Sequence, residues 1–302
     1  MARPIARASA LIASATTVGF LLAGCAGSTG AVIGVPSSAT PSRHGAVSID
    51  NAINQAIENE LIQANQTQSV NEPAISQVEL NALTSVRSVV RAEAFDTLLA
   101  NGAKQIAKRE GLVSTLIADV QADKYLTGVD LAGASLSGRL LSILGGVNSH
   151  LQALGAKIAS DLLPDVLRSD FLSIGPSTRI SGLVEPMTHL TIAGGDELSE
   201  LNALAASERQ LASQVAAGAS TDSNYAAETS RLRDLTASIA SARATVDSGL
   251  AAVLSLTAGG FPANKATIVS VRSALIQLRS PFGKIGGANA DATAILELLA
   301  KR

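Results

Sequence analysis

Aromatic residues and cysteine are scarce in this 302-residue chain, which has no tryptophan, one cysteine and an aromatic content of 2%. Sugar-binding and base-stacking surfaces usually need aromatic platforms, so the composition disfavours a carbohydrate-binding module. The formal net charge is −2, and the basic residues form no run longer than Lys108-Arg109. Since binding to phosphates requires a basic face, we expect no nucleic-acid partner.

Sequence motifs for common chemistry are also missing. The serine-hydrolase pattern G-x-S-x-G is incomplete at Gly133–Ser137, which lacks the last glycine, and no Ser-x-x-Lys occurs. Gly283-Lys284 lacks the upstream glycine spacing and the following hydroxyl residue of a phosphate-binding loop. We therefore predict a protein that is not an enzyme, with no catalytic residue, no cofactor site and no metal site.

The single cysteine, Cys25, stands directly after an apolar run near the start of the chain. Arg3 and Arg7 precede a stretch from Ala8 to Leu22 that carries no charge, and this layout is typical of a secretory signal peptide. The run is too short to span a bilayer, and a polar segment follows it. These features predict that the N-terminal segment is removed during export.

The last four residues of this pattern, Leu22-Ala23-Gly24-Cys25, resemble the lipobox of bacterial lipoproteins at every position. The resemblance implies cleavage between Gly24 and Cys25 and a thioether bond from the Cys25 sulfur to diacylglycerol. Acyl chains such as palmitate would then anchor the protein to the extracytoplasmic face of the cell membrane, since two or more chains hold firmly. The alternative is an ordinary signal peptide with a chance cysteine, although a lone thiol is a liability in an oxidising compartment.

The composition divides the chain into three parts. Residues 1–24 form the predicted signal peptide. Residues 25–46 form the lipidated cysteine and a flexible tether, which is rich in Gly, Ser, Thr and Pro and carries one charged residue, Arg43. Residues 47–302 form the predicted helical domain, with a candidate sub-boundary near residues 175–195. With Cys25 assigned to the lipid, the domain must be stable without disulfides.

Apolar residues recur at helical spacing over residues 47–302, and alanine is frequent, which favours helices packed on helices. Alternation typical of strands is absent. We therefore expect an all-α protein that forms an elongated helical bundle. Turns or caps are predicted at Asn71–Pro73, Asn101-Gly102, Thr127–Asp130, Ile174–Ser177 and Thr191–Gly195.

The clearest periodic pattern lies in residues 196–258. One helix is predicted to begin with Asp196 as its N-cap and to end before Gly218. After a short loop, a second helix is predicted from apolar residues one heptad apart, namely Tyr225, Leu232, Ile239, Val246 and Val253. Together the two helices predict a long antiparallel coiled-coil hairpin. Shorter helices are expected over residues 264–279 and 290–301.

Two segments flank this hairpin, LVEPMTHL at residues 183–190 and VLSLTAGGFPANKATI at residues 253–268. With the hairpin they resemble an uncharacterised group of secreted all-helical actinobacterial proteins, in which a similar Leu-Thr-Pro-x-x-(Tyr/Phe)-Pro-x-Asn-Lys turn follows the hairpin. The chain departs from this group at Ala258, where the group has proline, and at Pro281 and Gly283, which break the final helix. The resemblance implies a helical fold and an extracellular location, and it implies no activity.

Few residues of the helical part suit catalysis or metal binding. His150 and His189 are its only histidines, and neither has a partner at H-x-x-x-H spacing. A surface or capping role is the simpler interpretation of both. Asp161, Asp165 and Asp170 can place two carboxylates on one helical face, as general acid–base pairs require. A solvated face is the simpler interpretation of these three residues.

The pair Asn264-Lys265 lies in the turn after the predicted hairpin, at the start of a predicted helix. Backbone N–H groups at a helix N-terminus favour anions, so this pair is a candidate anion site. The simpler interpretation is that Phe261-Pro262 fixes the turn and Asn264 caps the helix.

Two hypotheses from different classes follow. The leading one is a membrane-anchored envelope lipoprotein that acts as a non-enzymatic helical scaffold or adaptor, with an envelope protein as its expected partner. The alternative is a carrier or binding protein for an apolar small molecule or lipid, because residues 136–154 are poor in charge and can line a cavity between helices. An apolar cavity favours the carrier, and a filled core favours the scaffold. The apolar heptad residues can pack against another helix of the same chain or against a second copy of the chain. A homo-oligomer is therefore also possible.

Overall fold

The computed structural model describes residue 55 and residues 57–64, 88–219, 223–280 and 282–301. The predicted signal peptide, the lipobox with Cys25 and the tether of residues 25–46 lie outside the described residues, as does the predicted turn at 71–73. The secondary structure of the described part is almost entirely helical, which confirms the all-α prediction. These residues all belong to one compact unit.

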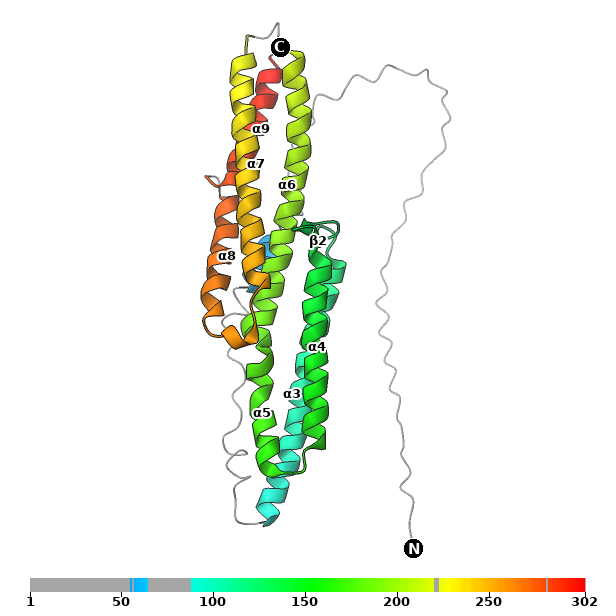
Figure 1. The fold of residues 1–302 in the computed structure, drawn as a ribbon. Helices are drawn as coiled ribbons and strands as arrows, with labels where there is room; N and C mark the ends of the chain where they lie inside the picture. Colours follow the sequence, from blue (N-terminus) through cyan, green and yellow to red (C-terminus); the bar gives the residue numbers. More distant parts are fainter. Residues whose placement is uncertain (1–54, 56, 65–87, 220–222, 281, 302) are drawn as a thin grey trace, which may run out of the picture. The chain divides into compact units, whose positions relative to one another are not determined.

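The described part contains α3 (Ser88–Ala122), α4 (Leu136–Ser160), α5 (Pro164–Thr178), α6 (Glu185–Ala217), α7 (Tyr225–Leu254), α8 (Asn264–Arg279) and α9 (Lys284–Leu299). A π-helix covers Ile180–Val184, a 3₁₀ turn covers Ala258–Gly260, and residues 57–64 are also helical. The helices run side by side (Figure 1). α3, α4 and α5 pack against one another, and α7, α8 and α9 pack against one another and against α6.

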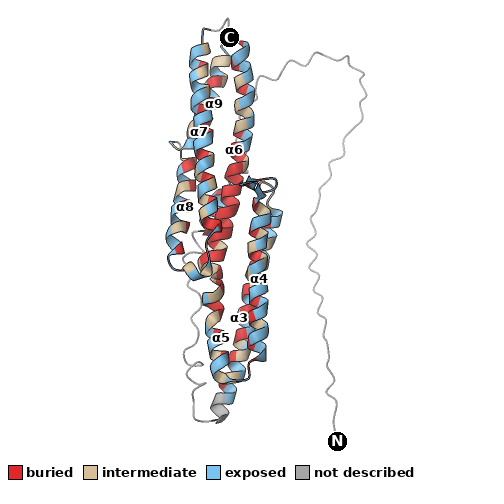
Figure 2. Ribbon diagram, in the orientation of Figure 1, coloured by how far each residue is buried: buried red, intermediate tan, exposed pale blue. Residues whose placement is uncertain are grey.

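The first half of α6 is buried on all sides (Figure 2). Residues 186–198 are all buried because several elements surround them. The neighbouring side chains include Leu136 of α4, Leu250 of α7, Arg279 of α8 and Glu60 of the segment 57–64. A helix without a solvent-facing side must satisfy any polar group that it carries inside the protein.

The predicted break before Asp196, and the predicted N-cap role of Asp196, are wrong because this residue lies inside α6. The two preceding glycines permit close packing instead of a turn. A Cβ atom on Gly194 would lie 2.6 Å from Leu250 Cδ2, and one on Gly195 would overlap the side chain of Leu126. Gly-Gly-Asp is a typical turn signal, but here tertiary packing determines the role of the glycines.

The helix boundaries around α3 and α4 also differ from prediction. α3 continues through the predicted cap at Asn101-Gly102, where a Cβ atom on Gly102 would lie 3.0 Å from Ile158 Cγ2 of α4. The chain between residues 136 and 178 forms two helices. α4 ends at Ser160, and α5 begins at Pro164, a residue whose missing N–H suits the first turn.

A small β-hairpin replaces the predicted capping box at Thr127–Asp130. Asp130 lies in β1 (Asp130–Leu131), which pairs with β2 (Ala134–Ser135) in antiparallel register. The two residues between the strands have positive φ angles, 53° at Ala132 and 76° at Gly133, as tight hairpin turns require. Helix α4 starts only after Ser135, whose Oγ accepts a hydrogen bond from the Gly138 N–H at 3.2 Å.

The heptad residues of α7 contribute to a larger bundle. Thr236 Oγ1 donates a hydrogen bond to Glu208 Oε1 of α6 at 2.9 Å, and Arg243 donates to Asn202 of α6. The buried face of α7 includes Ile239, and α7 packs as extensively against α9 as against α6. The predicted coiled-coil hairpin is therefore not confirmed, because the heptad stripe is shared among several helices.

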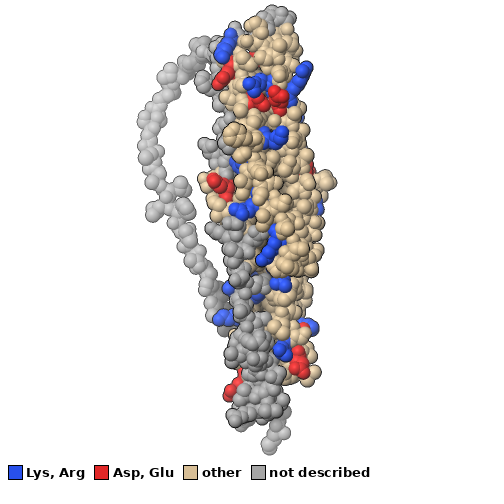
Figure 3. All heavy atoms as spheres, turned by 90° about the vertical axis from the view of Figure 1, so that its left-hand side faces the viewer, with Lys and Arg blue, Asp and Glu red and all other residues tan. Residues whose placement is uncertain are grey.

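Several apolar side chains of the described surface are exposed, among them Val269, Ile276 and Phe282. Lys and Arg side chains are scattered along the face drawn in Figure 3 and do not gather in one patch. At the corner between α4 and α5, by contrast, Leu162 is 88% exposed and Leu163 is 63% exposed, with the exposed Val166 beside them in sequence. We call these three residues the leucine corner.

Candidate functional site

The connection between α5 and α6 departs from regular α-helix. α5 ends at Thr178, and Arg179 adopts a left-handed conformation with a φ of 47°, which costs a residue other than glycine about 1–3 kcal/mol. The Val184 N–H then donates to the Arg179 carbonyl at 3.2 Å, within the π-helix Ile180–Val184. The helix break that was predicted at Ile174–Ser177 therefore lies after Thr178, because residues 174–177 belong to the last turn of α5.

The turn after α7 packs against this irregular connection. The Arg179 guanidinium lies over the Phe261 ring at 4.5 Å from its centroid, and Lys265 Nζ lies 5.1 Å from the same centroid. Asn264 Nδ2 donates a hydrogen bond to the Thr257 carbonyl at 2.6 Å. Asn264 and Lys265 therefore both make contacts within the turn.

A cavity of about 290 Å³ lies between α4, this connection and this turn. α4 contributes Ile143, Gly146, Val147 and His150, which are spaced three and four residues apart and so share one face of the helix. These residues belong to the charge-poor segment that the sequence indicates as able to line a cavity. The volume is close to the lower end of the range for small-molecule sites.

The opposite wall of the cavity comes from the two irregular segments. The connection supplies Leu183 and Val184, and the start of α6 supplies Met187. The turn after α7 supplies Leu256 and Ala258. The two segments that carry the resemblance noted above, 183–190 and 253–268, therefore line the same cavity.

The polar groups of the cavity wall are few and mostly satisfied. The Ser177 and Thr178 hydroxyls both donate to the Ile174 carbonyl, at 3.4 and 3.1 Å, and the Thr257 carbonyl accepts the bond from Asn264. His150 is exposed, and its ring makes no hydrogen bond to the described residues. Among the described residues that line the cavity, none is Asp, Glu, Lys or Arg.

A second polar cluster, which sequence reasoning misses, is buried in α6. Arg279 Nη1 of α8 donates to Glu197 Oε1 at 2.9 Å and to Glu200 Oε2 at 3.1 Å. Burial raises the pKa of Glu197 to about 7, although the Arg279 guanidinium acts in the opposite direction. The sequence signal for this cluster is the presence of acidic residues in a stretch whose other residues are apolar or small. The sequence does not indicate that Arg279 is the cation that pairs with them.

Asp196 lies beside this cluster with no solvent exposure. Burial raises the pKa of Asp196 to about 9, and the negative charges of Asp123 and Glu60 act in the same direction. Neither carboxyl oxygen of Asp196 meets a hydrogen-bond donor in the described part. The carboxyl is therefore neutral at pH 7, and in that form its own O–H can donate to the Asp123 carboxylate.

The two candidate histidines are separated. His189 is buried in α6, and its Nδ1 lies 2.6 Å from Glu60 Oε2 of the segment 57–64. This contact joins the segment to α6, but His189 does not line the cavity. His150 lies at the cavity instead. In the described part, no group of three or more His, Cys, Asp and Glu residues could hold a metal ion.

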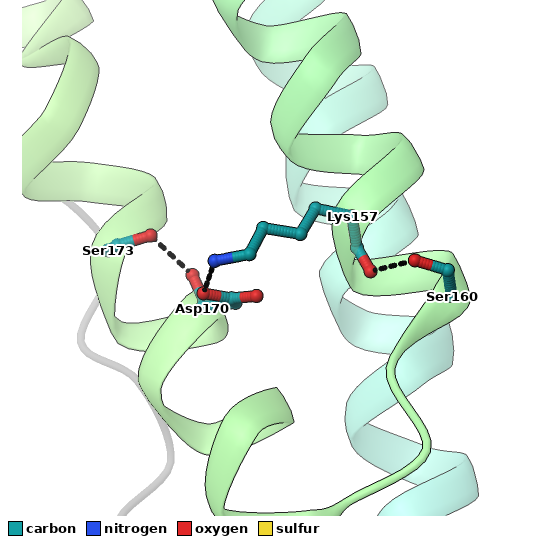
Figure 4. A network of polar contacts seen from close by, with 4 residues as sticks. All are labelled: Lys157, Ser160, Asp170 and Ser173. Atoms are coloured by element: carbon teal, nitrogen blue, oxygen red, sulfur yellow. Dashed lines mark hydrogen bonds and ion pairs between the residues drawn. The ribbon is translucent and has the colours of Figure 1, made fainter.

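Asp170, one of the three candidate aspartates, is held at the end of α4 by Lys157 (Figure 4), and its negative charge acts on Asp161. Lys157 Nζ lies 2.6 Å from Asp170 Oδ1, so the ion pair links α4 to α5. Asp161 is buried nearby, and its pKa is raised by burial and by the negative charge of Asp170. Asp165 is exposed and takes no part in these contacts. The cluster therefore fixes the helix corner.

No described helix is both long enough and apolar enough to cross a membrane. Comparison with known proteins found no match among family models, curated proteins or solved structures. The function must therefore be argued from the cavity, the buried polar cluster and the surface of this chain.

Proposed function

We propose that this chain is a lipid-anchored cell-envelope protein whose helical part binds an apolar small molecule in the cavity between α4 and the α5–α6 connection. The single observation that carries the binding function is the apolar cavity of about 290 Å³. It favours the carrier hypothesis over a scaffold with a filled core. Each Å² of apolar ligand surface removed from water contributes about 25 cal/mol, so a ligand without strong polar contacts can bind such a site.

The construction of the wall supports this proposal. Pro186 has no backbone N–H and would break a continuous α5–α6 helix, so the chain must depart from regular α-helix in this region, and it does so with a left-handed residue at Arg179. π-helical turns such as Ile180–Val184 are rare and occur frequently at functional sites. Here the irregular connection supplies Leu183 and Val184 to the cavity. The cost of the irregular backbone is consistent with a wall that is shaped for a ligand.

Filling the cavity should abolish binding. Gly146 lines the cavity, and no atom lies within 4 Å of the position that a Cβ atom would take there. The leucine side chain of Gly146→Leu should therefore occupy the space of the ligand without a clash. We expect at least a tenfold loss of labelling by an alkyl diazirine at the cavity residues, such as Val147 and Met187. The measurement is photolabelling of the full-length protein in membranes, followed by mapping of the labelled residues by mass spectrometry.

Gly145→Leu is the matched control for this variant. Gly145 is also in α4 with open space around its Cβ, but it does not line the cavity. Both variants gain helix propensity to a similar extent. Labelling of Met187 that is equally strong in the wild type and in Gly146→Leu would refute the binding function.

The lipid anchor is tested at Cys25. Cys25→Ala removes the only thiol of the chain, so we expect complete loss of incorporation of a palmitate analogue and either release of the protein or its accumulation as an uncleaved precursor. Ser28→Ala, three residues further on, should leave incorporation and membrane fractionation unchanged. Unchanged acylation and cleavage in Cys25→Ala would overturn the anchor proposal.

A second candidate function, the scaffold or adaptor, is supported by the leucine corner. Leu162 and Leu163 are apolar and largely exposed, and an exposed apolar group is a common feature of protein contact sites. A photo-crosslinking residue in place of Leu163 should capture one dominant envelope protein in living cells. The same residue in place of the exposed Val269 of α8 should not. Equal capture at both positions would reject the adaptor function for this corner.

A further inference from the structure

We propose that the ligand of this cavity is uncharged and carries one hydrogen-bonding group, which lies against His150 at one end of the cavity. This inference rests on the proposed binding function and specifies the class of molecule. It follows from three observations: the residue types of the wall, the positions of the nearest charges, and the hydrogen-bonding groups that remain available.

The wall offers no partner for a charged ligand. The described residues that line the cavity include no carboxylate, ammonium or guanidinium group. Burial of an ionised group without a partner is costly, and much more so than burial of a neutral hydroxyl that keeps one hydrogen bond. A carboxylate or an amine inside this cavity would therefore lose solvation without compensation.

The charged residues that adjoin the lining residues in the sequence lie outside the wall. Arg179 follows the lining residue Thr178, but its guanidinium lies over the Phe261 ring at 4.5 Å. Glu185 follows the lining residue Val184, and burial raises the pKa of its carboxyl, while the nearby His189 acts in the opposite direction. Neither Arg179 nor Glu185 lines the cavity. These groups therefore do not compensate for charge on a ligand.

Free hydrogen-bonding capacity remains at two exposed lining residues, His150 of α4 and Thr257 of the turn after α7, whose hydroxyl makes no hydrogen bond within the described part of the chain. The hydroxyl protons of Ser177 and Thr178 are used by the Ile174 carbonyl. His150, by contrast, forms no hydrogen bond within the described part of the chain, and a neutral imidazole has one donor and one acceptor. A ligand hydroxyl can use either.

The position of His150 also orients the ligand. Ile143 and His150 are seven residues apart on the lining face of α4, which corresponds to about 10 Å along a helix that rises 1.5 Å per residue. One end of this face is aliphatic and the other is polar and exposed. The apolar body of the ligand should lie along Ile143 and Val147, with its polar group at His150.

A pair of photoprobes tests this inference in the full-length protein in membranes. Both have the same ten-carbon diazirine chain, and one ends in a hydroxyl group while the other ends in a carboxylate. At pH 8 and equal concentration in the membrane, we expect the hydroxyl probe to label Val147 and Met187 at least tenfold more than the carboxylate probe. Labelling by the carboxylate probe that equals or exceeds labelling by the hydroxyl probe would overturn the inference.

Variants separate this inference from the proposed function itself. His150→Leu should reduce labelling by the hydroxyl probe at least fivefold, and should leave labelling by the alkyl diazirine within twofold. Ser149→Leu, at an exposed neighbour that does not line the cavity, should change neither. If the alkyl diazirine labels the cavity but His150→Leu does not alter hydroxyl labelling, the role of His150 is wrong and the binding function stands. If no probe labels the cavity, both fail.

Discussion

Replacement of Arg279 by methionine is expected to destabilise the folded protein by about 3–5 kcal/mol, since removal of one partner leaves a buried charge uncompensated. Arg279 contacts Glu197 and Glu200, whose side chains are 0% and 6% exposed. In the Arg279→Met variant these two carboxyls would remain inside the bundle with no cation beside them. The measurement is chemical denaturation of the full-length protein at pH 7, followed by far-UV circular dichroism.

Arg231→Met is the matched control for this prediction. Arg231, like Arg279, forms an ion pair: its Nη1 lies 2.9 Å from Asp291 Oδ1. In contrast to Arg279, the Arg231 side chain is 53% exposed. Exposed pairs contribute about 0–1 kcal/mol, so this variant should be close to wild type. Similar losses in Arg231→Met and Arg279→Met would mean that the buried cluster contributes no more than a surface pair.

The effect of Arg279→Met should also depend on pH. Without the guanidinium, the influence that lowers the pKa of Glu197 is lost, and burial remains as the influence that raises it. A folded-state pKa above the unfolded value means that stability falls as the pH rises through that interval. We therefore expect a smaller loss at pH 5, where the Glu197 carboxyl can be protonated, than at pH 8. Glu197→Gln in the Arg279→Met background should recover part of the stability at pH 8.

Replacement of Asp196 by asparagine is expected to stabilise the protein, and more at high pH than at low pH. In the folded chain the pKa of Asp196 is about 9, because of burial first and of the charges on Asp123, Glu60 and Glu197 next. The ordinary value for this side chain is 3.8. The stability associated with neutral Asp196 is therefore complete below about pH 4 and is lost as the pH rises toward about 9.

One proton taken up on folding corresponds to a slope of about 1.4 kcal/mol per pH unit. The asparagine side chain cannot ionise, and its amide N–H can donate to the Asp123 carboxylate as the protonated acid does. Asp196→Asn should therefore remove this slope and should be more stable than wild type by about 2 kcal/mol or more at pH 8. The measurement is the free energy of unfolding of both proteins at pH 5, 6.5 and 8.

Asp234→Asn is the control, because Asp234 is exposed on α7 and surface substitutions usually change stability by less than about 0.5 kcal/mol. Its pH dependence should match that of the wild type. A parallel pH profile for Asp196→Asn and wild type would mean that Asp196 is not the neutral buried acid described above.

Several features of this protein could be predicted from its sequence. Apolar residues at helical spacing predicted the all-α class, and the charge-poor residues 136–154 indicated a segment able to line a cavity. Of the heptad residues of α7, Ile239, Val246 and Val253 are buried, whereas Tyr225 and Leu232 are partly buried. These predictions succeed because helical periodicity depends on residues three to seven positions apart, which a sequence shows directly.

The roles of individual residues were harder to predict. Gly194, Gly195 and Asp196 form a typical turn signal, yet all three lie in the buried part of α6. In the candidate site, nothing in the sequence indicated that residues 183–190 and 253–268 meet at α4. The left-handed residue at Arg179 also has no local signal, since arginine is not a residue that favours this conformation.

The sequence by itself determined the all-α class, because helical periodicity depends on residue type and short spacing. Only the tertiary structure decided that Glu197 pairs with Arg279, 82 positions away, that glycines at 194 and 195 admit leucine side chains, and that three separate segments line one half-open cavity. The physical reason is that burial and pairing are properties of groups brought together from distant positions. Their pKa values and packing depend on neighbours that local periodicity does not specify.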